Sequence, residues 1–356
     1  MRKLIAIVGI VGVPSRYGGF ETIVDQLAQR YDGSDRVVVF CSRGAYGVQQ
    51  GKYERFDRVF LPFKANGLSS VFYDIFSMFY GLIFLRASTI LVLGVSGALA
   101  IPFLKIIWPR RKFVVNIDGL EWARGKWGKI ARTFLKVSEA AACRWSDVVI
   151  SDNPAISSYV KGKYDRVPVL LSCGGEHATK GRFVEAFQGC PDDFFLSICR
   201  IEPENNVEMI LEAFKKVKKN IVFVGNWSSS KFGRELVERF GCEENIFLVG
   251  PFFDPDIVYS LRARCKAYVH GHSAGGTNPS LVEILHMRKV PICFDCEYNR
   301  ETTFGKAVYF STELELSGLV WHSDQCVARG KFEDLFDQSI DYYSWDRIAK
   351  GYYELF

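Results

Sequence analysis

The chain has 356 residues, which is longer than one hydrophobic core usually supports and fits two domains of ordinary size. Hydrophobic residues make up 48% and charged residues 24%, a balance that excludes a disordered or fibrous protein and predicts a globular one. Ten cysteines are scattered along apolar segments, as buried thiols are in a reducing compartment. The single CxxC, Cys293 to Cys296, lacks the second pair or the spaced histidines of a zinc site, so we interpret it as core packing.

Charge is uneven along the chain, although the net charge is only +5. Residues 1–170 carry 24 Lys and Arg against 13 Asp and Glu, whereas residues 171–356 carry 21 against 27. The basic half contains cations interleaved with tryptophans: Lys105, Trp108, Arg110, Arg111, Lys112, Trp122, Arg124, Lys126, Trp127, Lys129, Arg132 and Lys136. Such a face suits anionic lipid head groups, and equally an ordinary solvated surface. Nucleic acid ranks lower because no helix-turn-helix, zinc-finger or RNP-like motif accompanies the cluster.

In chain order, the first half alternates short apolar runs with helical patterns, which is typical of a doubly wound parallel sheet. Strands are expected at residues 4–13, 36–41, 59–63, 90–95, 113–118, 147–151 and 167–171. Apolar residues recur with helical spacing from Phe20 to Ala28, so one stripe of this helix should face the sheet. The start of the chain has the basic and apolar character of a signal peptide, but its glycine-rich continuation favours a first strand.

Two apolar segments of the first half raise the question of a membrane span. Residues 71–85 include Asp74 and are too short to span, and residues 89–108 contain Pro102 and Lys105 and predict a strand followed by a helix. We therefore expect no transmembrane helix. Residues 71–85 could graze a bilayer as an amphipathic element or pack as a helix on the parallel sheet, and the sequence leaves both open.

A second alternation of strands and helices follows residues 173–191, a glycine-containing polar segment that we interpret as a linker. The predicted domains are thus residues 1–172 and 173–343. Strands are expected at residues 194–199, 221–225, 246–249, 267–270, 290–294 and 308–310. The first helix of this half presents one apolar face: Val207, Ile210, Leu211, Phe214 and Val217. The last helix, residues 344–356, has an apolar stripe that needs a partner surface: Trp345, Ile348, Tyr352 and Phe356.

Each half has a glycine-rich turn after a strand, where parallel sheets bind their ligands. The first is GVPSRYGGFET at residues 12–22, in which Gly18 and Gly19 lead into the helix and Arg16 could meet a charged ligand. A tight turn that merely requires glycine is the alternative. Gly9 and Gly12 lie inside the predicted first strand and form no GxGxxG, which argues against a nicotinamide oxidoreductase.

The second turn, VHGHSAGGTNPSLVE at residues 269–283, has the features of an anion site at a helix start. Gly275 and Gly276 let backbone amides approach a ligand, Asn278 is a good N-cap and Pro279 suits the first helical position. Amides and the positive helix end would stabilise a phosphate, and Glu283 could accept hydrogen bonds from neighbouring hydroxyls. A sugar nucleotide has both groups, although an ordinary strand-to-helix turn would have the same local sequence.

Five segments in order resemble the family-four glycosyltransferases of the GT-B fold, and among them the bacterial rhamnosyltransferases of polysaccharide synthesis. They are GVPSRYGGFET at 12–22, VVNIDGLEWARGKW at 114–127, SDVVISDN at 146–153, RIEPENN at 200–206 and HGHSAGGTNPSLVE at 270–283. The resemblance implies two Rossmann-like parallel-sheet domains facing a cleft. It also implies that the first binds the acceptor, that the second binds the nucleotide-sugar donor, and that the last helix returns to the first domain.

The resemblance also implies residue roles. Glu283 matches the glutamate that holds the nucleotide ribose, and Arg200 matches the arginine that binds the diphosphate. Two positions depart from the family, since Gly275 stands where a sugar-binding glutamate is usual and Asn205 where a lysine is usual. The whole expected donor site is Gly18, Gly19, Arg200, Asn205, Asn206, Gly275, Gly276, Thr277, Asn278, Ser280, Leu281 and Glu283.

The acceptor side is expected to comprise Arg16, Tyr17, Glu121, Trp122 and His272. Asp118 stands in this branch where the wider family often has a histidine, and it would orient the hydroxyl or stabilise charge on the sugar ring, so Asp118, Arg200 and Glu283 are the catalytic candidates. Asp118 could instead only cap the following helix. His270 is interpreted as a core residue and His272 as a cleft-edge candidate. The histidines form no metal cluster, so a metal-independent reaction without a cofactor is expected.

These features together predict a cytoplasmic hexosyltransferase, peripheral on the inner face of the membrane, that acts with retention of configuration. The expected reaction moves L-rhamnose from dTDP-L-rhamnose to a polyprenyl-diphosphate-linked saccharide of O-antigen or capsule. The expected partners are this donor, the lipid-linked acceptor and the anionic membrane surface, through the basic N-terminal domain. Three alternatives stay open: a transferase of another UDP, GDP or dTDP sugar, a sugar-nucleotide epimerase of the same fold, and a lipid-surface binding protein without turnover.

Overall fold

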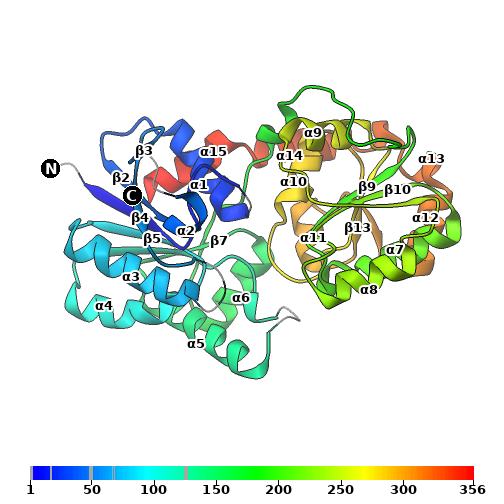
Figure 1. The fold of residues 1–356 in the computed structure, drawn as a ribbon. Helices are drawn as coiled ribbons and strands as arrows, with labels where there is room; N and C mark the ends of the chain where they lie inside the picture. The colour runs from blue at the N-terminus through cyan, green and yellow to red at the C-terminus, as the bar shows by residue number, and fades with distance from the viewer. Residues whose placement is uncertain (1–2, 17, 48–50, 66, 68, 124–126) are drawn as a thin grey trace. The chain divides into compact units, whose positions relative to one another are not determined.

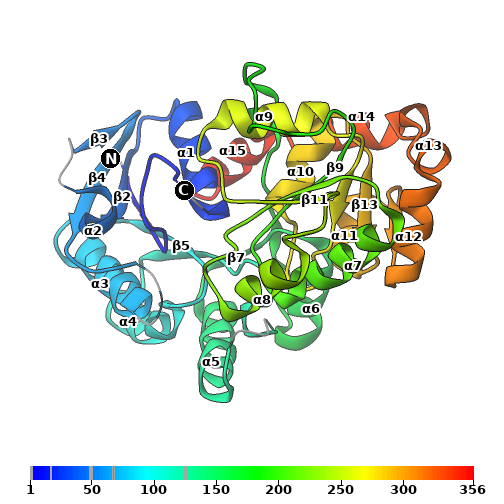
Figure 2. The ribbon, with the colours of Figure 1, turned by 45° about the vertical axis from the view of Figure 1, so that its right-hand side comes forward.

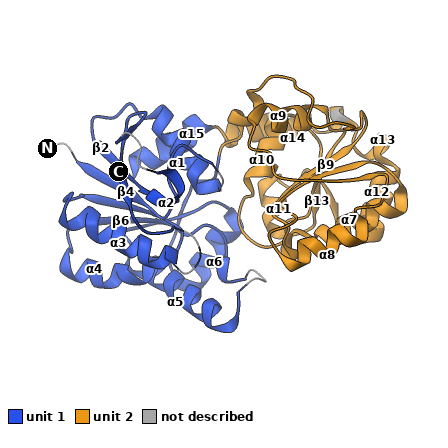
Figure 3. Ribbon diagram, in the orientation of Figure 1, with its two compact units in different colours: residues 1–173, 345–356 blue, residues 174–344 orange. Residues whose placement is uncertain are grey.

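The computed structural model describes residues 3–16, 18–47, 51–65, 67, 69–123 and 127–356. The chain divides into two compact units, Met1–Cys173 with Trp345–Phe356 as unit 1 and Gly174–Ser344 as unit 2 (Figure 3). Each unit is built on one sheet whose two faces are covered by helices (Figure 1). The predicted pair of Rossmann-like parallel-sheet domains is therefore confirmed.

The sheet of unit 1 has the strand order β3-β4-β2-β1-β5-β6-β7-β8, and all of its pairs are parallel except β3 with β4. Its strands are β1 (Leu4–Val8), β2 (Arg36–Ser42), β3 (Lys52–Tyr53), β4 (Phe56–Leu61), β5 (Thr89–Leu93), β6 (Lys112–Asn116), β7 (Val148–Ser151) and β8 (Val169–Leu170). Every residue of β5 is buried, because helices cover both faces of the sheet. That is why the strands read as continuous apolar runs in the sequence.

The first strand is shorter than predicted. β1 ends at Val8, and Gly9 and Gly12 follow it with φ of 94° and 149° instead of lying inside the strand. A side chain at position 9 would place its Cβ 2.1 Å from the carbonyl oxygen of Leu93, so the chain can leave the sheet here only with glycine. The apolar character of residues 9–13 comes from burial of the turn, which periodicity cannot distinguish from a strand.

Unit 1 contains α1 (Gly19–Arg30), α2 (Arg43–Tyr46), α3 (Ser69–Ile83), α4 (Ile101–Ile107), α5 (Lys129–Trp145), α6 (Pro154–Tyr164) and α15 (Trp345–Glu354), with the short 3-10 helices η1 (Ala98–Ala100) and η2 (Glu121–Ala123). Residues 89–108 form a strand and then a helix, as predicted. Within the described part of the chain, no helix is both long and apolar enough to cross a bilayer.

The C-terminal helix α15 belongs to unit 1, although its sequence follows unit 2 (Figure 2). Its predicted apolar stripe is buried: Trp345, Ile348, Tyr352 and Phe356. Asn116 Nδ2 at the end of β6 donates to the hydroxyl of Tyr352 at 2.7 Å, and the hydroxyl of Tyr353 donates to the carbonyl of Leu27 in α1 at 2.6 Å. The predicted return of the last helix to the first domain is thus confirmed.

Unit 2 has the strand order β11-β10-β9-β12-β13-β14, with all of its pairs parallel. The strands are β9 (Phe195–Ile198), β10 (Ile221–Val224), β11 (Ile246–Val249), β12 (Tyr268–His270), β13 (Pro291–Phe294) and β14 (Val308–Phe310). The helices are α7 (Val207–Val217), α8 (Lys231–Phe240), α9 (Pro255–Arg264), α10 (Pro279–His286), α11 (Glu297–Thr302), α12 (Glu313–Trp321), α13 (Ser323–Cys326) and α14 (Glu333–Tyr342), with η3 (Glu176–Thr179), η4 (Pro203–Asn205) and η5 (Arg329–Lys331).

The segment that we interpreted as a linker is packed structure in its first part. Residues 176–179 form η3, and the preceding Gly175 lies so close to α10 that a Cβ there would be 2.3 Å from the ring of His286. Polar side chains and glycines hid this contact from a search for periodicity. Of the two cysteines in the CxxC, Cys293 is fully buried in β13, and burial raises the pKa of its thiol, which agrees with a packing role.

Candidate functional site

The turn between β12 and α10 in unit 2 forms a capped helix start, as the sequence predicts. The side chain of Asn278 accepts a hydrogen bond from the amide of Ser280 at 3.0 Å, and Pro279 is the first residue of α10. Gly275 has a φ of 138°, a backbone conformation that L side chains rarely adopt. The turn therefore brings backbone amides and the positive end of an eight-residue helix to one place, an arrangement that suits an anion.

The loop after β9 packs directly against this turn. The side-chain Nδ2 of Asn206 donates to the carbonyl of Gly271 at 2.8 Å, and the backbone amide of Ser273 donates to the carbonyl of Glu204 at 2.9 Å. Gly271 has no room for a side chain, because its Cβ would lie 2.1 Å from the carbonyl oxygen of Asn205. The two segments that the sequence assigned to the donor site, 200–206 and 270–283, are thus joined in unit 2.

His272 and Asn205 form the centre of this junction. Asn205 Nδ2 donates to the carbonyl of Arg200 at 2.7 Å, which turns its Oδ1 toward His272 Nδ1 at 2.9 Å. Since a carbonyl oxygen only accepts, the proton of a neutral His272 is on Nδ1. Both side chains are buried, and the carbonyl of His272 accepts from Asn299 Nδ2 at 2.8 Å, so the imidazole is held firmly.

The imidazole of His272 occupies the space that a side chain at position 275 would need. A Cβ on Gly275 would lie 2.8 Å from His272 Nε2. The two departures from the resembling family, Gly275 and Asn205, are therefore linked through one histidine. We expected His272 on the acceptor side, whereas the contacts described here are to residues that we had placed on the donor side.

Glu283 is a largely buried carboxylate, with a side chain that is 12% exposed, and it has two partners that the sequence did not reveal. Its Oε1 lies 3.0 Å from His177 Nε2, and its Oε2 pairs with Arg262 Nη2. Burial works against ionisation of Glu283, but Arg262 and His177 outweigh it, so the net effect is a lowered pKa. Glu283 is therefore an anion at neutral pH, pre-oriented one turn inside α10.

His177 and Arg262 escaped the sequence search for a simple reason. His177 lies 106 residues before Glu283 in η3, and Arg262 lies in α9, within the run of basic residues that ends the helix. A basic last turn is common in helices and gave no signal of a site. Only the packing of η3 and α9 beside α10 makes them partners of Glu283.

Arg200 differs from Glu283 in that its side chain is 44% exposed. Its contact with Glu202 is long, at 3.8 Å between Nε and Oε2, and an exposed pair of this kind contributes little to stability. The guanidinium is therefore able to move onto an anionic ligand at small cost. His270, in contrast, is 2% exposed and burial lowers its pKa to about 3, which confirms its interpretation as a neutral core residue.

The other expected donor-side residues follow from the turn and the loop. Ser280 and Leu281 lie in the first turn of α10, where Leu281 is buried in the core of unit 2. Thr277 is buried beside Thr302, with their hydroxyls 3.5 Å apart. Gly276 adjoins Gly275 in the same turn. Leu281 therefore supports the helix from the core, and residues 275–278 form the turn that leads into it.

In unit 1, Asp118 follows the end of β6 in an uncommon conformation. Its φ is 58°, and its backbone amide donates to Asn116 Oδ1 at 3.0 Å. Asn116 is the residue that also contacts Tyr352 of α15, so the strand end is braced by the C-terminal helix. The same left-handed conformation occurs at the helix C-caps Asp165 and Lys218, so the role of Asp118 stays a prediction.

Two of the expected acceptor-side residues have contacts inside unit 1. Glu121 Oε1 accepts from the indole N–H of Trp127 at 3.1 Å, and the indole N–H of Trp122 donates to Glu139 at 2.8 Å. Glu139 is buried and accepts further hydrogen bonds from two tyrosines and a lysine. Trp122, which belongs to the basic cluster, thus packs against α5. Arg124 and Lys126 of that cluster lie outside the described residues.

The turn before α1 is tightly built. Gly18 has a φ of 134°, and a Cβ there would meet Glu21 Oε2 at 2.1 Å. Glu21 is buried, which raises its pKa, and its Oε1 accepts from the amide of Val11 at 2.9 Å. Gly18 and Gly19 begin α1 as predicted, and Arg16 donates to the carbonyl of Ala45 at 2.6 Å. Tyr17, the remaining acceptor-side candidate, lies outside the described residues.

Comparison with known families matches the two halves of the chain separately. Residues 2–175 match a domain of unknown function, DUF1972, and residues 187–307 match the glycosyl transferases group 1. No curated protein sequence is significantly similar to this chain. The group 1 match covers Arg200, the glycine-rich turn, Arg262 and Glu283, whereas His177, the other partner of Glu283, lies before it.

Solved structures resemble the whole chain at low identity. Sucrose-phosphate synthase from Thermosynechococcus elongatus is 14% identical, with a TM-score of 0.81 over 99% of this chain and 98% of that one. Anabaena HepE in complex with UDP-glucose is 13% identical, with a TM-score of 0.73 and coverage of 99% of both chains. A glycosyltransferase from Rickettsia africae is 14% identical, with a TM-score of 0.72 over 99% of this chain and 97% of that one. These likenesses establish the GT-B fold.

Proposed function

We propose that this chain, which has the GT-B fold and matches the glycosyl transferases group 1 over residues 187–307, transfers L-rhamnose from dTDP-L-rhamnose. The proposed acceptor is a polyprenyl-diphosphate-linked saccharide of a bacterial surface polysaccharide, and the reaction proceeds with retention of configuration. The enzyme works in the cytoplasm, at the inner face of the membrane. Unit 2 takes the donor and unit 1 takes the acceptor.

One observation carries the donor assignment. Hydrogen bonds and an ion pair hold the 200–206 loop, the glycine-rich turn and Glu283 together around the N-terminus of α10. Backbone amides there suit the diphosphate, and Arg200 suits its outer oxygens. Ionised Glu283 suits the ribose hydroxyls, because a carboxylate accepts from two neighbouring donors. The similarity to HepE, which has been seen with UDP-glucose, supports a nucleotide-sugar donor.

The sugar itself is held differently from the pattern in the resembling family. A glutamate at position 275 would collide with His272 and would require a left-handed backbone, so a carboxylate cannot take this place. The imidazole of His272, fixed by Asn205, stands beside it instead. We infer that this enzyme contacts its donor sugar with a single imidazole ring, which suits a deoxysugar with one hydroxyl fewer than a hexose.

The chemistry follows from where charge develops. The C–O bond between the sugar and the diphosphate breaks, and negative charge on the leaving diphosphate is stabilised by Arg200 and the amides of the turn. The acceptor hydroxyl attacks the same face and gives its proton to an oxygen of the leaving diphosphate. Asp118 orients that hydroxyl or stabilises positive charge on the sugar ring. None of these steps requires a metal ion.

The donor assignment is tested with a panel of dTDP, UDP and GDP sugars. Transfer and hydrolysis are measured with and without a lipid-linked acceptor. Turnover of dTDP-L-rhamnose is expected, whereas turnover of only a UDP or GDP sugar would overturn the choice of donor. Conversion of the donor to an epimer without acceptor would instead indicate an epimerase.

The donor site is tested with Arg200→Ala and Glu283→Ala. Each removes a hydrogen bond to a charged group, so nucleotide affinity should fall about tenfold to hundredfold. Arg239→Ala is the matched control, since this arginine of unit 2 is similarly exposed but pairs with Glu208 and Glu212 on the helix surface. Unchanged nucleotide affinity in Arg200→Ala or Glu283→Ala, measured by calorimetry, would remove that residue from the site.

A further inference from the structure

Helix α3 has an apolar surface on the side that faces away from the sheet. Its inner side packs in the core with Tyr73, Met78 and Leu82, as expected for a helix on a parallel sheet. Its outer side is also apolar, with Phe72 at 72% exposure and Phe84, directly after the helix, at 68%. A helix on the surface of a globular protein normally has a polar outer face. The structure confirms the sheet-packing interpretation of residues 71–85 for the inner side of the helix, and the exposed apolar outer side keeps the bilayer interpretation as a prediction.

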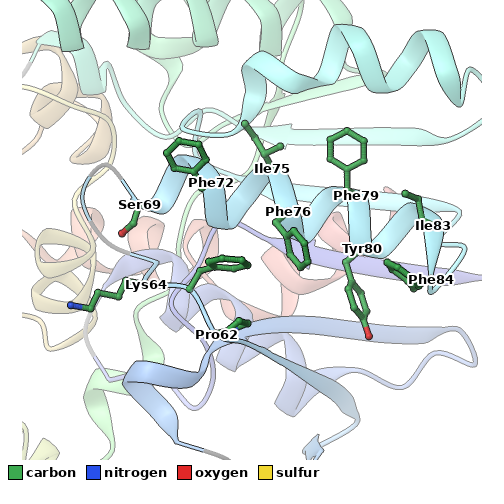
Figure 4. A pocket seen from close by; sticks show the side chains of 11 residues that line it. Pro62, Lys64, Ser69, Phe72, Ile75, Phe76, Phe79, Tyr80, Ile83 and Phe84 are labelled. Atoms are coloured by element: carbon green, nitrogen blue, oxygen red, sulfur yellow. The ribbon is translucent and has the colours of Figure 1, made fainter.

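The exposed side of α3 borders a groove of about 770 Å³. Its other wall is formed by Pro62 and Phe63 after β4, and Lys64 and Ser69 stand at one end (Figure 4). Aromatic rings follow one another along the groove, with centroid distances of 5.1 Å from Phe63 to Phe76 and 4.9 Å from Tyr80 to Phe84. The lining is almost wholly hydrocarbon, which suits an apolar chain and not a sugar.

Helix α4 extends this surface. Phe103, Ile106 and Ile107 are 56%, 71% and 44% exposed, and Trp108 after the helix packs on Phe79 of α3 at a centroid distance of 6.3 Å. Figures 1 and 2 both show α3 and α4 side by side on the same face of the sheet of unit 1. We refer to the exposed apolar residues of α3 and α4, with the groove, as the α3–α4 face. An exposed apolar surface of this extent marks an interaction site.

Charge indicates which partner fits the α3–α4 face. Between residues 62 and 117 the sequence contains six basic residues: Lys64, Arg86, Lys105, Arg110, Arg111 and Lys112. The only acidic residue in that interval is Asp74, which is 3% exposed and bonded to Ser96. Lys105 is paired with Asp147, but these segments keep an excess of positive charge through Lys64, Arg86 and Arg110. An apolar face on such segments is complementary to a bilayer with anionic head groups, since the rings enter the hydrocarbon boundary while the cations remain at the phosphates. A soluble protein partner would not require the charges of these segments to be mainly positive.

We propose that the α3–α4 face docks this enzyme on an anionic lipid bilayer, with lipid hydrocarbon filling the groove. This docking extends the proposed function and rests on it in one respect, namely that the proposed acceptor is lipid-linked. It keeps the first part of the basic cluster, Lys105 to Lys112, as part of the expected contact and leaves out Trp122, because Trp122 is engaged with Glu139 inside unit 1. The docking residues lie outside the donor site of unit 2.

The test measures flotation of the full-length protein with vesicles, without donor or acceptor. Wild type should bind vesicles of phosphatidylcholine with phosphatidylglycerol and bind pure phosphatidylcholine far less. The triple variant Phe72→Ser, Phe84→Ser, Ile106→Ser should lose about a hundredfold in partition, because three exposed apolar side chains no longer enter the bilayer. All three are exposed, so folding should be unaffected, which circular dichroism checks.

The matched control is the triple variant Val167→Ser, Phe253→Ser, Leu314→Ser, whose residues are 79%, 74% and 81% exposed and lie outside α3 and α4. It should bind vesicles as wild type does. A charge variant, Lys64→Glu with Arg86→Glu, should lose the preference for phosphatidylglycerol while keeping its fold.

Two results would overturn the proposal. One is equal vesicle binding by wild type and the α3–α4 triple variant. The other is a wild type that binds no vesicles but forms a dimer in light scattering, which the triple variant abolishes; the face would then join two copies of this chain. Donor hydrolysis is measured on the same samples and should be equal in all variants. A wrong donor assignment would change the hydrolysis result and leave the vesicle result untouched.

Discussion

At the scale of single residues, polar contacts hold the donor-side site together, and each residue restricts the charge or the size of the residue beside it. Glu283 is ionised because Arg262 and His177 lie beside it, and Gly275 is required because His272 fills the adjoining space. Such contacts are sensitive to single substitutions, since a buried polar group left without its partner loses more than the bond contributed.

Arg262→Leu should destabilise the protein by about 3–5 kcal/mol, because it leaves the Glu283 carboxylate buried without its cation. Arg264→Leu, two residues later in α9, is the matched control, because its partner Asp192 is fully exposed and the pair contributes at most about 1 kcal/mol. Urea denaturation of the two variants measures the difference. Equal losses would show that the Arg262 pair is not what stabilises this region.

The same pair sets a dependence on pH. The pKa of Glu283 is lowered in the folded protein from an ordinary value of 4.5, so its contribution to stability is complete above that value. The contribution is lost as the pH falls through the lowered folded pKa. Glu283→Gln should therefore flatten the acid side of the stability curve below about pH 4.5, measured as melting temperature against pH. An acid side as steep as that of wild type would contradict the assignment.

Gly275→Ala should both destabilise the turn and weaken use of the donor. An alanine at this position must adopt a positive φ, which costs about 1 kcal/mol of folding free energy. Its Cβ also displaces the side chain of His272, which adds to that cost. Gly305→Ala is the control, because Gly305 also has a positive φ but nothing lies within 4 Å of its Cβ. Adding His272→Ala to Gly275→Ala should recover stability relative to the sum of the single changes. Strict additivity in thermal unfolding would show that the two positions do not collide.

At the scale of the elements, α15 holds the strand ends of unit 1 in place. It buries Trp345 and Tyr352 completely, and its contact with Asn116 continues to the backbone of Asp118. The last helix is therefore more than a covering of α1. It braces the loop that carries the proposed catalytic carboxylate, which gives a reason for the chain to return to its first unit.

Tyr352→Phe should destabilise unit 1 by about 1–3 kcal/mol, because Asn116 Nδ2 then has lost its acceptor in a buried place. It should also lower kcat with less effect on KM for the donor, since the loop at Asp118 loses its support while unit 2 is unchanged. Tyr80→Phe on the exposed side of α3 is the control for loss of a hydroxyl alone. A Tyr352→Phe enzyme with normal kcat would separate α15 from the catalytic loop.

At the scale of the whole molecule, two ligand surfaces belong to different units. The nucleotide is proposed to bind unit 2, and the bilayer is proposed to meet the α3–α4 face of unit 1. The uneven charge of the chain agrees with this division, since the basic half contains the α3–α4 face.

Hydrogen exchange should resolve the two surfaces in one protein. Addition of dTDP should protect residues 200–206 and 271–283 and leave α3 and α4 unchanged, because binding stabilises the segments that contact the ligand. Anionic vesicles should protect α3 and α4 and leave the turn unchanged. Protection of α3 by dTDP alone would contradict the separation of the two surfaces.

The sequence by itself predicted the features that depend on neighbours along the chain. Alternating apolar runs indicated two parallel sheets, Asn278 and Pro279 predicted the start of α10, and the stripe from Trp345 to Phe356 predicted a helix in need of a partner. Arg200 and Glu283 were identified because their segments resemble a family. Local periodicity and capping are encoded within a few residues, so one sequence suffices to find them.

Only the tertiary structure decided which distant residues meet. His177 and Arg262 became partners of Glu283, and Asn205 met His272, through packing of elements far apart in the chain. The same holds for Gly9, whose place outside β1 depends on the carbonyl of Leu93, and for α3, whose outer side the sheet leaves uncovered. Such contacts have no periodicity in the sequence, because they depend on how complete elements pack against one another.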